Sequence, residues 1–248
     1  MQPEIHLGPL ELKTFGICFA LGFLVAGGVL ARRLRELGKP GDWSYEITFA
    51  ALVGGILGSR IDYMVQNWDK VSHDLLGNVF SGSGLVWYGG AVGGAVGVLL
   101  WARRRGWATL TLLDVAAVPL AVGYAVGRIG CQLSGDGDYG IASSLPWAMS
   151  YPEGTVPTTQ EVHPSPVYET LAMGFVALLL WRWRDRFRPG GLFGLYLVLA
   201  GMERLLVEFV RRNDEVVAGL TLPQLVSLAM IAGGTALLAT LRREPSPA

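Results

Sequence analysis

Three arginines lie within or at the ends of otherwise apolar stretches of the chain: Arg60, Arg128 and Arg204. A guanidinium group keeps its charge in any surroundings and offers paired N–H donors that match the oxygens of a phosphate. An ionisable side chain inside a membrane costs roughly 2.5–3.5 kcal/mol on insertion scales, so it faces a wet cavity or a partner. If these arginines converge, they would suit the phosphate of an anionic lipid head group.

Acidic side chains in the same stretches allow a simpler interpretation. Arg204 and Glu208 are four residues apart, so they share a helix face and would neutralise each other. Asp114 lies next to a basic loop and is expected to be a helix cap or an interface partner. Structural pairing and a functional site therefore both stay open for these charges.

His163 and the cysteines are the remaining candidates for chemistry. His163 would serve as a base, because an ordinary histidine has a pKa near 6.5. Pro164 and Pro166 follow it, so a structural junction at a helix start is the alternative. Cys131 is expected to be a packed side chain rather than a nucleophile. Two cysteines without zinc-type spacing predict no metal, and no cofactor is expected.

Composition indicates the elements that must hold these residues. Of the 248 residues, 51% are hydrophobic and only 16% are charged, with 20 basic residues against 20 acidic ones. Soluble domains carry roughly a quarter charged residues. The composition excludes a disordered chain and a nucleic-acid binder driven by net positive charge. It predicts an all-α integral membrane protein.

Seven stretches approach the roughly 20 apolar residues that a membrane-spanning helix needs. The longest connection, 129–165, has no Lys or Arg, is rich in Gly, Pro and Ser, and is long enough to predict a functional loop. We expect a single transmembrane domain over residues 1–248, with this region facing outward. The predicted spans are 14–31, 45–65, 85–102, 110–128, 166–183, 192–210 and 220–241.

The distribution of basic residues predicts the orientation. Thirteen of the Lys and Arg residues follow the first, third, fifth and seventh spans, and four lie on the opposite side. Positive charge marks the cytoplasmic side of a membrane protein. The N-terminus is therefore expected outside and the C-terminus in the cytoplasm. Glycines recur at small-xxx-small spacing in three spans, which predicts close helix packing.

Five motifs along the chain match those of one known family. Gly127-Arg128-Ile129-Gly130 followed by Ser134-Gly135-Asp136 is similar to the family signature. Tyr88-Gly89-Gly90 falls where the family has His-Gly-Gly. The other matches are Gly58-Ser59-Arg60-Ile61-Asp62-Tyr63, His163-Pro164-Ser165-Pro166-Val167-Tyr168-Glu169, and Arg204-Leu205-Leu206-Val207-Glu208-Phe209-Val210-Arg211. Together these motifs resemble the prolipoprotein diacylglyceryl transferase family.

The resemblance implies a transferase of the bacterial inner membrane that moves a diacylglyceryl group from phosphatidylglycerol to a lipobox cysteine in the signal peptide of a prolipoprotein. Such chemistry needs a thiolate and cations that stabilise a phosphate leaving group. It implies that Arg128 and Arg204 act on the phosphate and that Glu208 orients Arg204. The other catalytic candidates are His163 and Tyr88, and the substrate-binding candidates are Arg60, Tyr63, Gly89, Gly90, Ser134, Asp136 and Tyr168.

Several positions depart from the family pattern. Tyr88 stands at the family histidine, Cys131 at the signature asparagine, and Ala200 at a usual tyrosine. Asp136 shortens the family glutamate, and the loop that follows it is one residue longer. A second hypothesis is therefore a catalytically silent paralogue that binds anionic phospholipid. A third is a transporter or channel lined by Arg60, Asp62, Arg204 and Glu208, although the chain shows no internal repeat. The sequence leaves the oligomeric state open.

Overall fold

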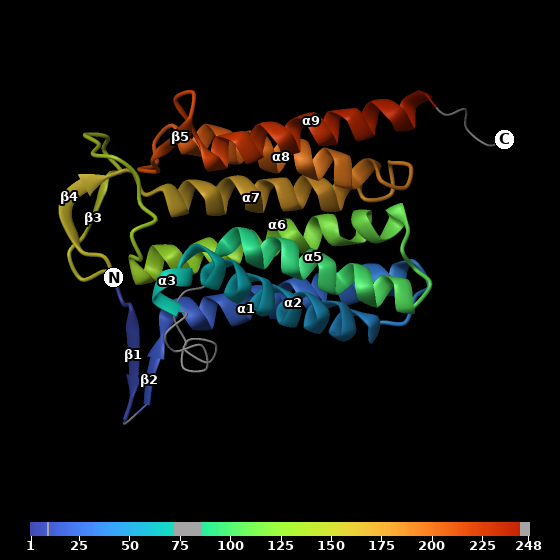
Figure 1. The fold of residues 1–248 in the computed structure, drawn as a ribbon, viewed down its shortest axis with the longest axis horizontal. Helices are drawn as coiled ribbons and strands as arrows, with labels where there is room; N and C mark the ends of the chain where they lie inside the picture. Colours follow the sequence, from blue (N-terminus) through green and yellow to red (C-terminus); the bar gives the residue numbers. More distant parts are fainter. Residues whose placement is uncertain (9, 72–85, 244–248) are drawn as a thin grey trace. The chain divides into compact units, whose positions relative to one another are not determined.

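The computed structural model describes residues 1–8, 10–71 and 86–243 and is mostly helical (Figure 1). Within these residues, seven helices have 18 residues or more, and each coincides with one of the seven predicted spans. The start of the third predicted span, residue 85, lies outside the described residues. The long helices are α1 (Thr14–Glu36), α2 (Trp43–Gln66), α5 (Trp87–Arg104), α6 (Leu110–Ser134), α7 (Ser165–Trp183), α8 (Gly191–Glu208) and α9 (Leu222–Arg243).

Four of these helices are long and apolar enough to cross a membrane by themselves. They are α1, α2, α6 and the segment Leu222–Leu241 of α9, which have 20 to 25 residues each. A hydrocarbon core about 30 Å thick requires a helix of about 20 residues. The chain is therefore a membrane protein built mainly from helices.

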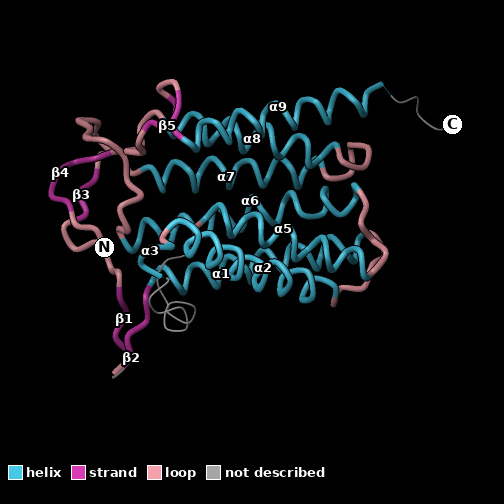
Figure 2. Tube along the Cα trace, viewed as in Figure 1, coloured by secondary structure: helices cyan, strands magenta, loops and turns pink. Residues whose placement is uncertain are grey.

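Short hairpins, which the sequence did not predict, precede α1 and join α6 to α7 and α8 to α9 (Figure 2). Each is an antiparallel pair whose strands have two to five residues, too few to leave a clear alternating pattern of apolar and polar residues. One further short helix, α3 (Trp68–Val71), follows α2. The hairpins are β1 (Glu4–Leu7) with β2 (Leu10–Lys13), β3 (Met149–Tyr151) with β4 (Thr158–Val162), and β5 (Glu215–Val217) with β6 (Leu220–Thr221).

The chain divides into two compact units. The larger unit contains Met1–Leu30 and Leu113–Ala248, and the smaller unit contains Ala31–Leu112. Each unit is described by itself below. The expectation of a single domain over residues 1–248 stays a prediction.

Small side chains of α6 form the core of the larger unit. Ala117 and Ala121 have no exposed surface and pack in one cluster with Met173 and Leu180 of α7 and Leu192 of α8. In addition, α8 packs against both α7 and α9 (Figure 1). This packing fixes the three helices that carry Arg128, Glu169 and Arg204.

Asp114 is a cap, as the sequence indicated. Its two carboxylate oxygens accept hydrogen bonds from the backbone N–H groups of Gly190, at 2.7 Å, and Phe193, at 2.8 Å. These groups belong to the N-terminal end of α8, where backbone N–H groups have no partner within the helix. A carboxylate on α6 thereby fixes the start of α8.

The predicted glycine packing is confirmed in the smaller unit, where α2 and α5 pack closely. A Cβ atom on Gly58 would lie only 2.8 Å from the Cα of Gly93, and one on Gly93 would meet Gly58 equally closely. Real Cβ atoms do not approach so near, so these positions accept only glycine without a shift of the helices. The two backbones are therefore in direct contact.

Helix α6 extends six residues beyond the predicted end of the fourth span, so Arg128 lies inside the helix and the expected loop 129–165 begins with helical residues. Gly130 packs against α1, because a Cβ there would lie 2.8 Å from the Cβ of Cys18. This contact explains why a glycine-containing segment continues as helix. The rest of the connection carries β3 and β4.

Candidate functional site

Three arginines of the larger unit gather around one buried carboxylate. Glu169 on α7 has no exposed surface. Its oxygens lie 2.8 Å from Nε of Arg128, 3.1 Å from Nη1 of Arg204 and 3.6 Å from Nη1 of Arg211. We call Arg128, Arg204 and Arg211 the arginine cluster. Arg128 and Arg204, two of the three arginines whose convergence was considered above, are thus brought together, and the third, Arg60, belongs to the smaller unit.

Two further carboxylates complete these ion pairs. Glu208 contacts Nη2 of Arg204 at 2.7 Å, which confirms the pairing expected from their spacing on one helix. Asp138, in the loop after α6, pairs with Arg128 through Oδ2 and with Nη2 of Arg211 at 2.5 Å through Oδ1. Ion pairs at such distances in a partly buried place fix the direction of each guanidinium group.

Tyr124 adds a hydroxyl to the same group of side chains. It lies one helical turn before Arg128 on α6, and its ring lies 5.0 Å below the guanidinium carbon of Arg128. Its hydroxyl accepts from Nη2 of Arg128 and donates to Oε1 of Glu169, both at 3.1 Å. Tyr124 therefore holds Arg128 against Glu169 from the opposite side.

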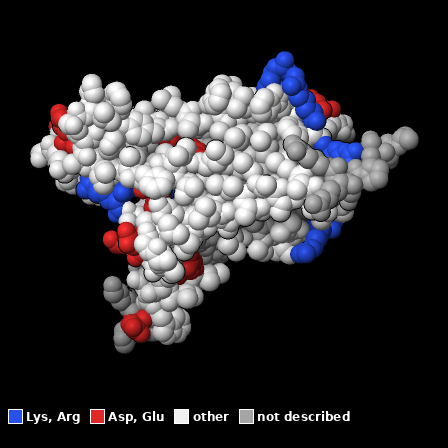
Figure 3. Space-filling view, turned by 90° about the horizontal axis from the view of Figure 1, so that it is seen from above, with Lys and Arg blue, Asp and Glu red and all other residues white. Residues whose placement is uncertain are grey.

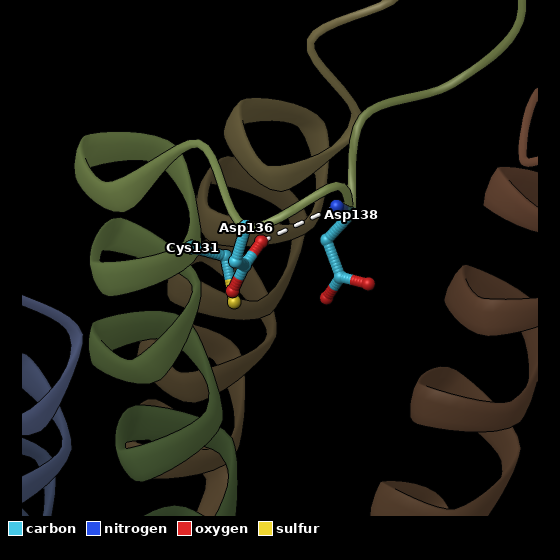
Figure 4. A group of neighbouring side chains, drawn as sticks. All are labelled: Cys131, Asp136 and Asp138. Atoms are coloured by element: carbon cyan, nitrogen blue, oxygen red, sulfur yellow. Dashed lines mark hydrogen bonds between the residues drawn. The ribbon is translucent and has the colours of Figure 1, made fainter. Parts of the chain in front are cut away.

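Asp136, the residue predicted at the family's glutamate position, makes different contacts. Its Oδ1 accepts a hydrogen bond of 3.2 Å from the backbone N–H of Asp138, and its carboxylate lies beside the sulfur of Cys131 (Figure 4). Burial, reinforced by the charge of Asp138, raises the pKa of Asp136. By contrast, burial opposes ionisation of Asp138, but Arg128 and Arg211 outweigh it and lower the pKa of this carboxyl.

Cys131, Asp136 and Asp138 each offer one ligand atom, and these atoms lie within 4.8 Å of one another (Figure 4). Both oxygens of Asp138 are engaged by guanidinium groups. Ion pairing therefore accounts for the position of Asp138 without an ion, and the group is not interpreted as a metal centre.

His163 and Tyr168 form a second contact within the larger unit. Nδ1 of His163 lies 3.3 Å from the hydroxyl of Tyr168, which accepts a hydrogen bond of 2.8 Å from Nε1 of Trp147. The backbone of His163 also pairs with Gly140 and Ile141. His163 therefore does form the structural junction that precedes α7, while its ring keeps a hydroxyl partner.

Ser134 is the last residue of α6 and is 2% exposed. Its hydroxyl donates to the carbonyl oxygen of Cys131 at 3.3 Å, and its own carbonyl accepts from Thr155. These contacts hold the start of the loop that carries Asp136 and Asp138.

The other predicted residues belong to the smaller unit. Arg60 is 6% exposed and lies over the ring of Tyr63 at 5.4 Å, and Tyr88 packs edge-to-face on Trp87. Asp62 accepts a hydrogen bond of 3.0 Å from the backbone N–H of Gly89. This hydrogen bond joins the Arg60 motif of α2 to the Tyr88 motif of α5. A Cβ on Gly90 would lie 2.8 Å from Oγ of Ser59, so close packing explains that glycine.

Comparison with known proteins identifies the relatives of the chain. The family model described as prolipoprotein diacylglyceryl transferase matches residues 3–240. The chain belongs to this family. Proteins named phosphatidylglycerol–prolipoprotein diacylglyceryl transferase are similar over most of their length. That of Vibrio vulnificus is 34% identical, covering 94% of this chain and 88% of the relative. The relative from Chromohalobacter salexigens is 33% identical, covering 97% of this chain and 92% of the relative. The relative from Clostridium tetani is 30% identical, covering 93% of this chain and 94% of the relative.

Four residues of the site were not among the predicted site residues of this transferase-family chain: Tyr124, Asp138, Glu169 and Arg211. Glu169 and Arg211 were present in the recognised motifs, and charge inside or beside an apolar span was the signal that pointed to them. Tyr124 and Asp138 carried no such signal, because their role depends on which neighbours the fold supplies.

Proposed function

We propose that the chain is a phosphatidylglycerol–prolipoprotein diacylglyceryl transferase. It takes the diacylglyceryl group of phosphatidylglycerol and joins it to the thiol of a lipobox cysteine in the signal peptide of a secreted precursor. The relatives that carry this name support the proposal, because they match the chain over nearly its whole length. The observation that carries it is the arginine cluster around Glu169.

In this reaction the arginine cluster stabilises the phosphate leaving group. The thiolate attacks C3 of the glyceryl group, a C–S bond forms, the C3–O bond breaks, and glycerol phosphate leaves with the bonding electrons. Negative charge grows on the phosphate as the bond breaks. Arg128 and Arg204 are already oriented by Glu169 and Glu208, so they stabilise that charge without reorganising.

The proton of the thiol needs an acceptor. His163 is our candidate base, since a neutral imidazole nitrogen accepts a proton and Nδ1 of this ring lies 3.3 Å from the Tyr168 hydroxyl. Tyr88, at the family histidine, is a poor base because an ordinary tyrosine has a pKa of about 10. We assign Tyr88 instead as a hydrogen-bond donor to the phosphate.

The remaining motif residues are assigned to binding of the lipid donor or to holding the segments that bind it. Arg60 and Tyr63 contribute to binding of the anionic head group. Gly89 and Gly90 let α5 approach α2 and so hold Tyr88 in place. Ser134 and Asp136 hold the loop on which Asp138 lies.

The proposed setting is the bacterial inner membrane. Seven spanning helices would place the N-terminus outside and the C-terminus in the cytoplasm, in agreement with the basic loops. The middle of the surface drawn in Figure 3 is largely uncharged, as a surface in contact with lipid requires. The connection between α6 and α7 would then face the side on which secreted precursors emerge.

Transfer of radiolabelled diacylglyceryl from phosphatidylglycerol to a lipobox peptide, measured with the purified protein in detergent, tests the proposal. We expect labelled peptide with the wild-type protein and none when the peptide cysteine is replaced by serine. Arg128→Ala is expected to lower the rate by about 100-fold or more, the usual effect of losing one donor to a developing negative charge.

Arg32→Ala is the matched control, because Arg32 is exposed on α1 and pairs with Glu36 at the surface. This variant should keep the wild-type rate. Full activity of Arg128→Ala would remove the cluster from the mechanism. An inactive wild-type protein that becomes active as Tyr88→His would instead identify a scaffold without its base, which is the silent paralogue considered above.

A further inference from the structure

The carboxylate of Asp138 takes up guanidinium donors of two arginines. Its Oδ1 lies 2.5 Å from Nη2 of Arg211, and its Oδ2 pairs with Nη1 of Arg128. A phosphodiester also presents two anionic oxygens from one centre, and guanidinium groups bind both kinds of anion in the same way. Asp138 and a phosphate therefore compete for the same donors.

The three carboxylates of the cluster differ in how firmly they are held. Glu169 has no exposed surface, and Glu208 accepts two further hydrogen bonds of 2.7 Å, from Asn213 and Thr221. The side chain of Asp138 is 33% exposed, and among the described residues its carboxylate has only the two arginines as hydrogen-bond or ion-pair partners. Of the three carboxylates, Asp138 therefore separates from its arginines at the smallest cost in free energy.

The backbone of Asp138 is held independently of its carboxylate. Its N–H donates to Asp136, and its carbonyl oxygen accepts from the Ser165 hydroxyl at 2.8 Å and from Nη1 of Arg211 at 3.0 Å. Rotation about the side-chain bonds therefore frees the arginines while the loop stays in place. Because separate contacts hold the backbone, the carboxylate can leave the arginines without disturbing the loop.

Charge balance favours the exchange. The ion pairs of the cluster join three guanidinium groups to Asp138, Glu169 and Glu208. A bound phosphodiester would add one negative charge in surroundings of low polarity, where an unbalanced charge is costly. Moving one carboxylate out to solvent as the phosphate enters restores the balance.

We propose that Asp138 is a placeholder for the phosphate of the lipid donor and is exchanged for it when the donor binds. This inference rests on the proposed function, since Arg128 and Arg211 belong to the arginine cluster that the proposed function assigns to the donor phosphate. In the free protein the carboxylate keeps Arg128 and Arg211 paired and correctly directed. In the complex the phosphodiester takes its place, and the strength of the aspartate contact sets the affinity for the head group.

Binding of glycerophosphoglycerol, a soluble phosphodiester, to the purified protein in detergent tests the exchange by isothermal titration. Asp138→Asn is expected to bind it about tenfold more tightly, because the neutral amide gives up the arginines more readily. Glu161→Gln, at an exposed position of β4 in the same connection, is the matched control. It should stay within about twofold of wild type, because the ion pairs of the arginine cluster do not include Glu161 and an exposed charge is screened by salt.

The pH dependence of binding gives a second test on the unaltered protein. Arg128 and Arg211 face Asp138 directly, with Asp136 and Cys131 beside it and Glu169 behind the arginines. These arginines lower the pKa of Asp138 in the free protein, and a displaced Asp138 recovers the ordinary aspartate pKa of about 4. Binding then takes up a proton, so affinity should rise as pH falls below about 5, and Asp138→Asn should lose this rise.

Weaker binding by Asp138→Asn, in a variant that still unfolds cooperatively, would overturn the inference and leave Asp138 as a residue that only orients the arginines. Asp138→Ser provides the same comparison if the amide variant fails to fold. The transfer assay separates this inference from the proposed function. If the protein binds the phosphodiester with the expected pH dependence but transfers nothing, the exchange stands and the transferase assignment is wrong. If it transfers the diacylglyceryl group but binds without that pH dependence, the assignment stands and the exchange is wrong.

Discussion

Glu169 shows at the residue scale how one side chain can organise several others. It receives three arginines from α6, α8 and the segment after α8, and it has no exposed surface. Burial removes the water that would otherwise screen these charges, so each contact is stronger than on the surface. The same burial makes the loss of any one partner costly, because the others are left with unbalanced charge.

Replacing Glu169 by glutamine should therefore damage both stability and activity. The change leaves the shape and removes the charge, so we expect the free energy of unfolding to fall by about 3–5 kcal/mol and transfer to slow by about 100-fold or more. Thermal unfolding in detergent and the transfer assay measure the two effects. Glu161→Gln, at an exposed position of β4, is the control. Unchanged transfer by Glu169→Gln would contradict the role given to Glu169.

Asp136 and Asp138 should affect stability in opposite directions as pH changes. The pKa of Asp138 is lowered, so its contribution is present above the unfolded value, about 3.9, and is lost as pH falls below it. The pKa of Asp136 is raised, so its ionisation destabilises the fold as pH rises above about 3.9. Unfolding temperatures near pH 7 should be lower for Asp138→Asn and higher for Asp136→Asn than for wild type. The same sign for both variants would refute this assignment.

At the scale of elements, the contact between α2 and α5 depends on missing side chains. Gly58→Ala should destabilise the protein by about 1–3 kcal/mol, because the added methyl group meets the backbone of α5. Gly28→Ala on α1 is the control, since nothing lies within 4 Å of a Cβ there. That change should be neutral or stabilising by up to about 1 kcal/mol. Equal unfolding temperatures for the two variants would show that α2 and α5 do not need this contact.

At the scale of the whole molecule, the testable property is the orientation in the membrane. Thirteen basic residues on one predicted side and four on the other predict that the C-terminus lies in the cytoplasm. A fluorescent protein fused after Ala248 should therefore fluoresce, while alkaline phosphatase fused at the same place should stay inactive. Fusions before α1 are expected to give the opposite pattern. Active phosphatase at the C-terminus would reverse the orientation and the side assigned to the α6–α7 connection.

The sequence by itself determined the helical elements and several local pairs. Apolar stretches of about 20 residues have few alternatives to a helix in lipid, so the seven long helices lie where they were expected. The pairing of Arg204 with Glu208 followed from their spacing, and the cap formed by Asp114 from its place beside a loop. The hairpins were missed because their short strands leave no periodic pattern.

Only the tertiary structure decided which charges meet. Asp136 matches the family glutamate by position, yet Asp138 is the carboxylate that pairs with Arg128 and Arg211. The continuation of α6 to Ser134 determines where the loop with these carboxylates begins, and the end of the helix cannot be derived from residue type. Ion pairs are short-range and directional, so a difference of two residues in a loop is enough to change the partner.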